Sequence, residues 1–266
     1  MSIDGLNCLT SLIDHFILHQ LFFIDNAMRS TTETQKSYAQ PHQPRSTSGI
    51  ARQKFDYFLV LDFEATCDDA HRIPEQEIIE FPLIKLNSTT FEMEARFHKY
   101  VLPDVNPQLT AFCTSLTGIK QDMLDNKPGF EQTMRSFDEW LREQNLISAE
   151  DGSKNEVNWT IVTCGDWDLK TQLRQQARRH NYPVPWYFKS WINVKIAYSE
   201  AIGGRADKGM MSMLRALNIT HQGRHHSGID DVINICAIVK AIAATGYVFR
   251  TTATEKGKVK KDPTNK

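Results

Sequence analysis

The sequence predicts an α/β domain built on a mixed sheet. Three apolar runs with strand character come first, and strand-like and helix-like segments then alternate towards the C-terminus. A meander of strands followed by strand–helix alternation indicates a mixed central sheet flanked by helices. The chain has 266 residues, which suffices for one domain of roughly 200 residues with tails.

Residues 1–54 are expected to precede the domain as a leader and a disordered linker. Segment 9–24 is apolar but short and interrupted by polar residues, whereas a transmembrane helix needs about 20 mostly apolar residues. A short amphipathic leader is therefore favoured, with an interfacial or targeting helix as the alternative, and no membrane partner is expected. Residues 29–52 are rich in Ser, Thr, Gln and Pro, which is typical of a disordered linker.

The expected domain covers residues 55–250 and opens with strands. The run 56–64 is rich in aromatic and branched aliphatic residues and contains neither Pro nor Gly, so it predicts the first strand. Two more strands are predicted at 77–87 and 91–101, and a short apolar one at 159–163.

Helices are predicted where apolar residues recur at helical spacing. Phe130, Met134, Phe137 and Leu141 define an amphipathic helix over 130–145. The other helices are expected at 169–180, which is basic, within 186–200, at 208–217 and at 229–244. The polar, basic tail 251–266 is predicted to be disordered.

Charge and cysteine content restrict the possible environments and partners. The formal net charge is −1, so any attraction to a polyanion must come from local patches or bound metal. The five cysteines are widely spread and form no C-x-x-C pair, which favours reduced thiols in an intracellular compartment, cytoplasmic or nuclear.

Two acidic residues interrupt the first apolar run. Side chains two apart on a strand share a face, so Asp62 and Glu64 are expected to point the same way. Two like charges in a half-buried strand need compensation, and a divalent cation suits two oxygen ligands. Such a pair at the end of a strand suggests half of a metal-dependent phosphoryl-transfer site.

Further acids occur where a strand or loop passes into a helix. Asp168 follows the strand 159–163, and His226 and Asp231 stand at the start of the last predicted helix. Each alone could be structural, because a helix start favours acidic residues as caps or near the helix dipole. The ordered combination with Asp62 and Glu64 favours a functional site.

This combination resembles the DEDDh class of 3′-to-5′ exonucleases, which have the RNase H-like fold. Within that class the similarity is to small members of the Eri-1 / 3′ histone-mRNA exonuclease family, from about Tyr57 to Gly246. The motifs that carry it are LDFEATC (61–67), FCTSLTGI (112–119), CGDWDLK (164–170), WINV (191–194) and GRHHSGIDD (223–231).

The resemblance implies an RNase H-like fold and a metal-dependent 3′-to-5′ exoribonuclease that releases 5′-nucleoside monophosphates. Its implied cofactor is a pair of Mg²⁺ ions, with Mn²⁺ as a substitute. Asp62 would bridge the ions, Glu64 and Asp231 would complete the site for the attacking water, and Asp168 would help hold the second ion. His226 would take the proton from the water, since its ordinary pKa of about 6.5 suits a general base.

Substrate contacts are also expected beside the site. Ala65 and Thr66 continue past the acids, and Thr117 and Gly118 match the family segment near the 3′-terminal nucleotide. Trp167 could stack on a base or pack in the core, and Gly118 could instead serve a turn.

Basic residues could supply further grip on a phosphate backbone. They lie along the helix after Asp168, where a solvated face and a phosphate-tracking role both stay open, and they are Lys170, Arg174, Arg178, Arg179 and His180.

The expected partner is nucleic acid, with RNA 3′ ends first and DNA as a further substrate. Nothing in the motifs reads a 2′-hydroxyl, so a nuclease acting mainly on DNA is one alternative. A non-catalytic RNA-binding adaptor of the same fold is the other.

Overall fold

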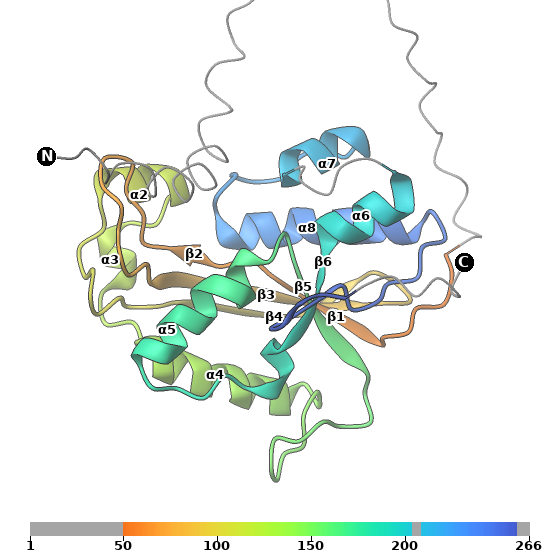
Figure 1. The fold of residues 1–266 in the computed structure, drawn as a ribbon, viewed down its shortest axis with the longest axis horizontal. Coiled ribbons are helices and arrows are strands. Elements are labelled where there is room, and N and C mark those ends of the chain that lie inside the picture. Colours follow the sequence, from red (N-terminus) through yellow and green to blue (C-terminus); the bar gives the residue numbers. More distant parts are fainter. Residues whose placement is uncertain (1–49, 204–208, 260–266) are drawn as a thin grey trace, which may run out of the picture. The chain divides into compact units, whose positions relative to one another are not determined.

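A computed structural model describes residues 50–203 and 209–259 of the chain, and a mixed sheet lies at its centre (Figure 1). The order of the strands is β2-β3-β1-β5-β6-β7-β8, and β4 pairs with β3. Their bounds are β1 Tyr57–Leu61, β2 Glu64–Ala65, β3 Ile78–Asn87, β4 Met93–Tyr100, β5 Trp159–Thr163, β6 Ser190–Asn193, β7 Ala253–Thr254 and β8 Gly257–Lys258.

Helices cover both faces of the sheet. Helices α6, α7 and α8 lie on one face, and α4 and α5 lie on the other (Figure 1). Their bounds are α2 Ala111–Thr117, α3 Gln121–Leu124, α4 Phe130–Glu143, α5 Leu173–Arg179, α6 Val194–Ile202, α7 Met210–Ala216 and α8 Gly228–Ala243, with a π-helix at Trp167–Gln172 and a 3-10 helix at Trp186–Phe188. Within the described ranges no helix is both long and apolar enough to cross a membrane.

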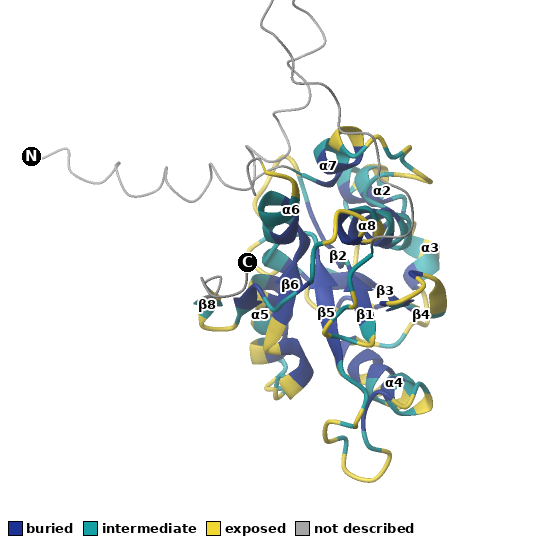
Figure 2. Cartoon of the chain, turned by 90° about the vertical axis from the view of Figure 1, so that its right-hand side faces the viewer, coloured by how far each residue is buried: buried dark blue, intermediate teal, exposed yellow. Residues whose placement is uncertain are grey.

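Strand β1 lies in the middle of this arrangement and contributes side chains to both faces. Leu59 and Leu61 pack with the apolar side chains of α4 and α5. Phe58 and Val60 pack with those of α6, α7 and α8. All four are fully buried, as the dark strands in Figure 2 illustrate. Alternation along one strand thus holds two hydrophobic layers together.

The mixed pairing follows the order of elements along the chain. Strand β1 pairs antiparallel with β3, which follows it in the sequence after β2. It pairs parallel with β5, which follows after helices α2, α3 and α4. Strand β6 continues the parallel part beside β5. The fold class predicted from the sequence is therefore confirmed.

The first predicted strand is not continuous. The run 56–64 divides into β1 and β2, with Asp62 and Phe63 between them outside any strand. Strand β2 pairs with β3 through an irregular register between Glu64 and Ala65. The expectation of a single strand was wrong here, because β1 stops where its chain turns past the acidic cluster.

A helix was predicted within residues 186–200, around residues 191–194, and this position was wrong. Residues Ser190–Asn193 form β6, and α6 begins only at Val194. Trp191 and Ile192 pair with β5 and are fully buried, so sheet pairing and burial override local preference here. Asn193 ends the strand and caps α6 by accepting a hydrogen bond from the Lys195 N–H at 3.0 Å.

Both domain ends are longer than the sequence indicated. The tail was predicted to be disordered after residue 250, yet β7 and β8 form a small hairpin that extends the sheet beside β6. Before the domain, Ile50 packs against the core, and the Gln53 side chain donates to the Tyr247 carbonyl at 3.0 Å. The predicted leader and most of the linker, residues 1–49, lie outside the described residues.

The start of α8 is fastened to the sheet by one buried carboxylate. Glu80 on β3 accepts hydrogen bonds from the backbone N–H groups of Gly228 at 3.0 Å and Ile229 at 3.3 Å. It also contacts His98 Nε2 at 2.7 Å. A carboxylate on the unpaired N–H groups of a helix start is favourable both as a hydrogen bond and in the field of the helix.

Gly228 allows this close approach. A Cβ at this position would lie 2.9 Å from Pro82 Cγ, 3.0 Å from Glu80 Oε2 and 3.1 Å from the Asp62 carbonyl oxygen. The backbone of α8 therefore reaches the end of β1 only because no side chain intervenes.

We expect Gly228→Ala to lower the free energy of unfolding by about 1–3 kcal/mol, because the added methyl group must push α8 away from β1 or β3. Urea denaturation of the full chain measures this. Gly129→Ala is the matched control, since Gly129 also stands at a helix start but has open space around it. Equal effects of the two substitutions would contradict the close-approach argument.

Candidate active site

Four carboxylates gather at the C-terminal ends of the central strands β1 and β5. Asp62 directly follows β1, and Glu64 forms part of β2. Asp168 lies in the π-helix that follows β5, and Asp231 lies in the first turn of α8. Because β1 and β5 are parallel neighbours, the segments that follow them start at the same end of the strands.

Hydrogen bonds and close approaches fix this group. The Phe63 N–H donates to Asp168 Oδ1 at 2.9 Å, which ties the break between β1 and β2 to the π-helix. Ligand atoms of Glu64, His226 and Asp231 all lie within 4.8 Å of one another. The three carboxylate residues Glu64, Asp168 and Asp231 are almost fully buried, at 9%, 5% and 3% exposure.

Burial and the charges of neighbouring carboxylates raise the pKa values of Asp62, Glu64 and Asp168. Burial raises the pKa of Asp62 well above its ordinary value, and the charges of Asp168 and Asp231 raise it further. Glu64 has a raised pKa for the same reasons, burial first and then the Asp62 charge. Burial also raises the pKa of Asp168 to about 6, although the Phe63 N–H and the Lys195 charge oppose this.

The donor set fits a hard divalent cation. Buried carboxylates that repel one another gain most from a cation placed between them, and Mg²⁺ prefers oxygen ligands. Asp62, Glu64, Asp168 and Asp231 supply these oxygens. Lys195 at the start of α6 lowers the pKa values of Asp62 and Asp168, but a single ammonium group leaves both of them raised.

His226 has an unusual backbone conformation beside Asp231. Its φ of 65° lies in the left-handed region, and its N–H donates to Asp231 Oδ2 at 2.9 Å. Its ring stacks on that of His225, with centroids 3.9 Å apart. Such conformations persist where surrounding contacts enforce them, often at functional sites.

Two further acids next to this cluster, Asp166 and Asp230, accept hydrogen bonds from other parts of the protein. Asp166 Oδ1 accepts hydrogen bonds from Trp191 Nε1 at 3.1 Å and Asn193 Nδ2 at 2.9 Å. Asp230 Oδ2 accepts the Arg224 N–H at 2.9 Å. Both therefore organise loops.

The residues expected to contact substrate divide into two groups. Ala65 and Thr66 are buried, and the Thr66 hydroxyl accepts the Glu77 N–H at 3.0 Å. The buried Thr117 hydroxyl donates to the Cys113 carbonyl at 2.8 Å. These side chains are thus occupied inside the protein, so contact through them is not supported.

Gly118 and Trp167 are more accessible. Gly118 ends α2 with a φ of 79°, and Trp167 is half-buried at the start of the π-helix. The guanidinium of Arg224 donates to the carbonyl oxygens of Ser115 and Leu116 and lies beside Gly118. Arg224 was not singled out from the sequence, because only the fold brings it to this loop.

Two arginines of the basic helix after Asp168 bind carboxylates within the protein. Arg179 donates to Glu77 Oε1 at 2.9 Å and to Asp104 Oδ1 at 3.2 Å. Arg174 donates to Glu255 Oε2 at 3.0 Å. These two charges are neutralised within the fold, which argues against their part in phosphate tracking, whereas Lys170 and Arg178 remain exposed.

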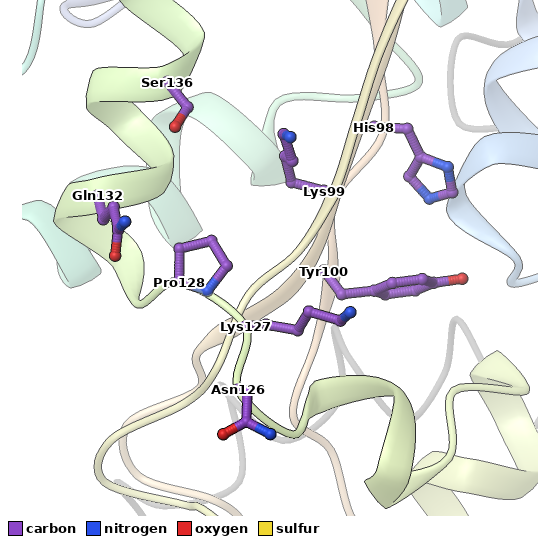
Figure 3. Close-up of a pocket in the computed structure, with 8 residues that line it drawn as sticks. All are labelled: His98, Lys99, Tyr100, Asn126, Lys127, Pro128, Gln132 and Ser136. Carbon is purple, nitrogen blue, oxygen red and sulfur yellow. The ribbon is translucent and has the colours of Figure 1, made fainter.

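A hollow of about 430 Å³ lies outside this cluster. Strand alternation directs His98 and Tyr100 to one side of β4 and Lys99 to the other (Figure 3). None of the four carboxylates lines it; its lining residues are His98, Lys99, Tyr100, Asn126, Lys127, Pro128, Gln132 and Ser136.

We expect Asp168→Asn to stabilise the metal-free protein at pH 7.5 by about 1–3 kcal/mol. The folded pKa of about 6 exceeds the ordinary 3.8, so ionisation of Asp168 opposes folding. This destabilisation is absent below the ordinary pKa and complete above the folded one. The gain should therefore shrink as pH falls through 6, while an asparagine can still accept the Phe63 N–H.

Urea denaturation in EDTA at several pH values measures this difference. Asp69→Asn is the matched control, because it makes the same substitution at an exposed position. A gain from Asp168→Asn that is equal at pH 5 and pH 7.5 would contradict the assigned burial effect.

The known proteins with similar sequences are named as exonucleases. The chain is 49% identical over 201 residues to human "ERI1 exoribonuclease 3", covering 76% of this chain and 58% of the relative. It is 34% identical over 229 residues to Drosophila melanogaster "3′-5′ exonuclease Snipper", covering 83% of this chain and 81% of that protein. The chain thus spans little more than half the length of the human relative.

A solved structure has the same fold. The nuclease domain of 3′hExo, described as a DEDDh family member bound to rAMP, superposes with a TM-score of 0.71 at 33% identity, covering 77% of this chain and 100% of that one. The Exonuclease family matches residues 59–239, which include all four carboxylates and His226. The chain therefore belongs to the Exonuclease family, whose DEDDh members depend on divalent metal ions.

Proposed function

We propose that this protein is a 3′-to-5′ exoribonuclease that hydrolyses RNA from its 3′ end to 5′-nucleoside monophosphates. The observation that carries the proposal is the approach of Glu64, His226 and Asp231 to within 4.8 Å, beside Asp62 and Asp168, in a chain of the Exonuclease family. Buried carboxylates next to a histidine supply both a metal site and a base, which phosphodiester hydrolysis requires.

Asp62, Glu64, Asp168 and Asp231 would hold two Mg²⁺ ions, for which Mn²⁺ could substitute. When bound, such ions neutralise phosphate charge and lower the pKa of water. The role of the chain is to fix the carboxylates before substrate arrives. The Phe63 N–H orients Asp168, and the His226 N–H orients Asp231, so the ligands need little rearrangement.

His226 would act as the general base. Its backbone is joined to Asp231, so the ring stays beside the carboxylates that would hold the ions. Stacking on His225 restricts its orientation further. A histidine held in this way can accept a proton from water near neutral pH.

RNA is the proposed main substrate, with its 3′ end as the point of attack. The human relative's name contains "exoribonuclease", and one solved neighbour of 31% identity is described as recognising the 3′ end of a histone mRNA stem-loop. The Drosophila relative is named only as an exonuclease, so DNA remains the alternative substrate. An intracellular location is proposed too, since the described cysteines are all free thiols.

We expect His226→Ala to lower turnover by about 10²- to 10⁴-fold, the usual contribution of a general base, while Mg²⁺ binding persists. Asp62→Ala should lose both turnover and Mg²⁺ binding. Release of labelled mononucleotide and isothermal titration with Mg²⁺ measure the two properties. The exposed residues His71 and Asp69 provide matched alanine controls. Wild-type turnover by Asp62→Ala would contradict the assignment.

A substrate panel tests the direction and the sugar preference. We expect 3′-labelled single-stranded RNA to release labelled 5′-monophosphate at once in Mg²⁺, and to release none in EDTA. Single-stranded DNA, stem-loop RNA and duplexes with 3′ overhangs complete the panel. Faster cleavage of DNA than of RNA would favour the DNA alternative, and no Mg²⁺-dependent cleavage of any substrate would favour a binding adaptor.

A further inference from the structure

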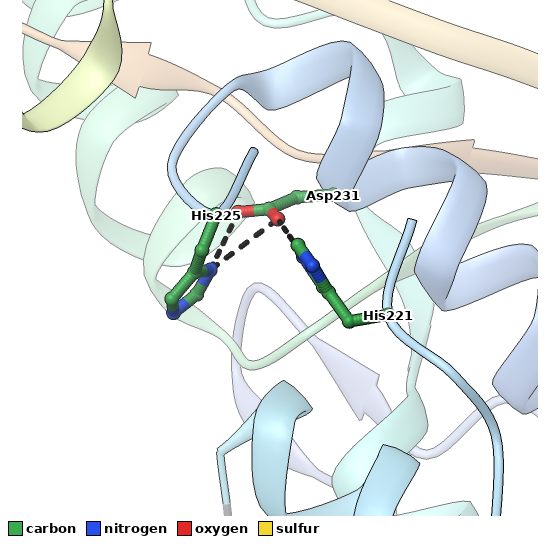
Figure 4. A group of neighbouring side chains, drawn as sticks. All are labelled: His221, His225 and Asp231. Atoms are coloured by element: carbon green, nitrogen blue, oxygen red, sulfur yellow. Dashed lines mark hydrogen bonds and ion pairs between the residues drawn. The ribbon is translucent and has the colours of Figure 1, made fainter. Parts of the chain in front are cut away.

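Two histidines of the loop before α8 face Asp231, and the proposed hydrolysis assigns neither of them a metal ion or a proton transfer. His225 Nδ1 lies 3.2 Å from Asp231 Oδ2 and 3.3 Å from its Oδ1. His221 Nε2 lies 4.0 Å from Asp231 Oδ1. Figure 4 shows both rings directed at the same carboxylate from different points along the loop.

The three side chains have the arrangement of a metal-binding group. One ligand atom from each of His221, His225 and Asp231 lies within 4.8 Å of the others. Donors of a tetrahedral zinc site stand roughly 3.3 Å apart, given zinc–nitrogen bonds of about 2.0 Å. Small side-chain rotations would therefore bring the three donors to zinc geometry.

His221 supplies an independent reason to expect a ligand. Its Nε2 atom is shielded from solvent and has no hydrogen-bond partner within the described residues. Buried polar atoms without a partner are rare, and each calls for an explanation such as an ion. A metal ion held at this nitrogen would supply the missing interaction.

The donor chemistry selects the class of ion. Imidazole nitrogens suit Zn²⁺ and related transition metals, whereas Mg²⁺ prefers oxygen ligands. Two imidazoles and one carboxylate match the ligand types of three-residue zinc sites. The oxygen-rich cluster of Asp62, Glu64 and Asp168 has the opposite preference.

We infer that His221, His225 and Asp231 form a second metal site, selective for Zn²⁺ over Mg²⁺, whose occupation inhibits the enzyme. Asp231 belongs to both groups, so a zinc ion there draws its carboxylate away from Glu64. His225 stacks on His226, so its coordination also fixes the neighbouring ring. Zinc binding stands on the geometry alone, whereas inhibition rests on the proposed nuclease function.

Binding is tested with metal-free full-length protein and Co²⁺, whose visible absorption reports tetrahedral coordination, followed by competition with Zn²⁺. We expect wild type to bind in the presence of excess Mg²⁺. His221→Ala and His225→Ala should each weaken binding by at least about tenfold. His71→Ala, at an exposed histidine, is the matched control and should bind as wild type.

Thermal unfolding in EDTA checks that the variants are folded, and His221→Asn offers a second substitution that keeps a polar side chain. Absence of tetrahedral Co²⁺ absorption in wild type would overturn the inference. So would equal affinities of wild type, His221→Ala and His221→Asn. His225 would then serve only as a hydrogen-bond partner of Asp231.

Inhibition is tested by adding Zn²⁺ to the Mg²⁺-supported nuclease assay. His221→Ala should keep the wild-type rate in Mg²⁺ alone and require at least about tenfold more Zn²⁺ for half-inhibition. Equal inhibition of both proteins would place the effect at the carboxylate cluster and overturn the regulatory part. Failure of the nuclease assay itself would contradict the proposed function and leave the Co²⁺ result to decide on the site.

Discussion

The contact between the start of α8 and the end of β1 organises this molecule. Glu80 receives two N–H groups of the first turn of α8, and Gly228 leaves room for the Asp62 carbonyl against the helix backbone. The same turn carries Asp231, and the loop before it carries His226. One close backbone approach thus brings α8 to the C-terminal end of β1, although the two elements are more than 150 residues apart in sequence.

This arrangement opposes the ordinary preference of carboxylates for water. Burial raises the pKa values of Asp62, Glu64 and Asp168, and their mutual repulsion contributes at Asp62 and Glu64. The hydrophobic layers on both faces of β1 hold the strand ends in place despite this repulsion. This repulsion favours metal binding, because carboxylates that repel one another in the empty site gain most from divalent cations.

Many polar residues near the site serve the scaffold. The sequence places Thr66, Thr117 and Arg179 among the candidates for contact with nucleic acid, yet each forms a hydrogen bond within the protein. Arg179, for instance, reaches the fully buried Glu77, which also accepts backbone N–H groups of the 104–106 loop. Lys195 and Arg224 instead lie near the carboxylates and the end of α2, and they reach these places only through the fold.

The sequence by itself determined the fold class, the long amphipathic and apolar helices and the order of the acidic motifs, because hydrophobic periodicity and residue identity are local properties. It also supplied the five proposed catalytic residues, whose roles remain a prediction. Only the tertiary structure decided that Ser190–Asn193 pair as a strand, that residues after 250 extend the sheet, and that His221 and His225 face Asp231. These features depend on partners distant in sequence, which local preference does not encode.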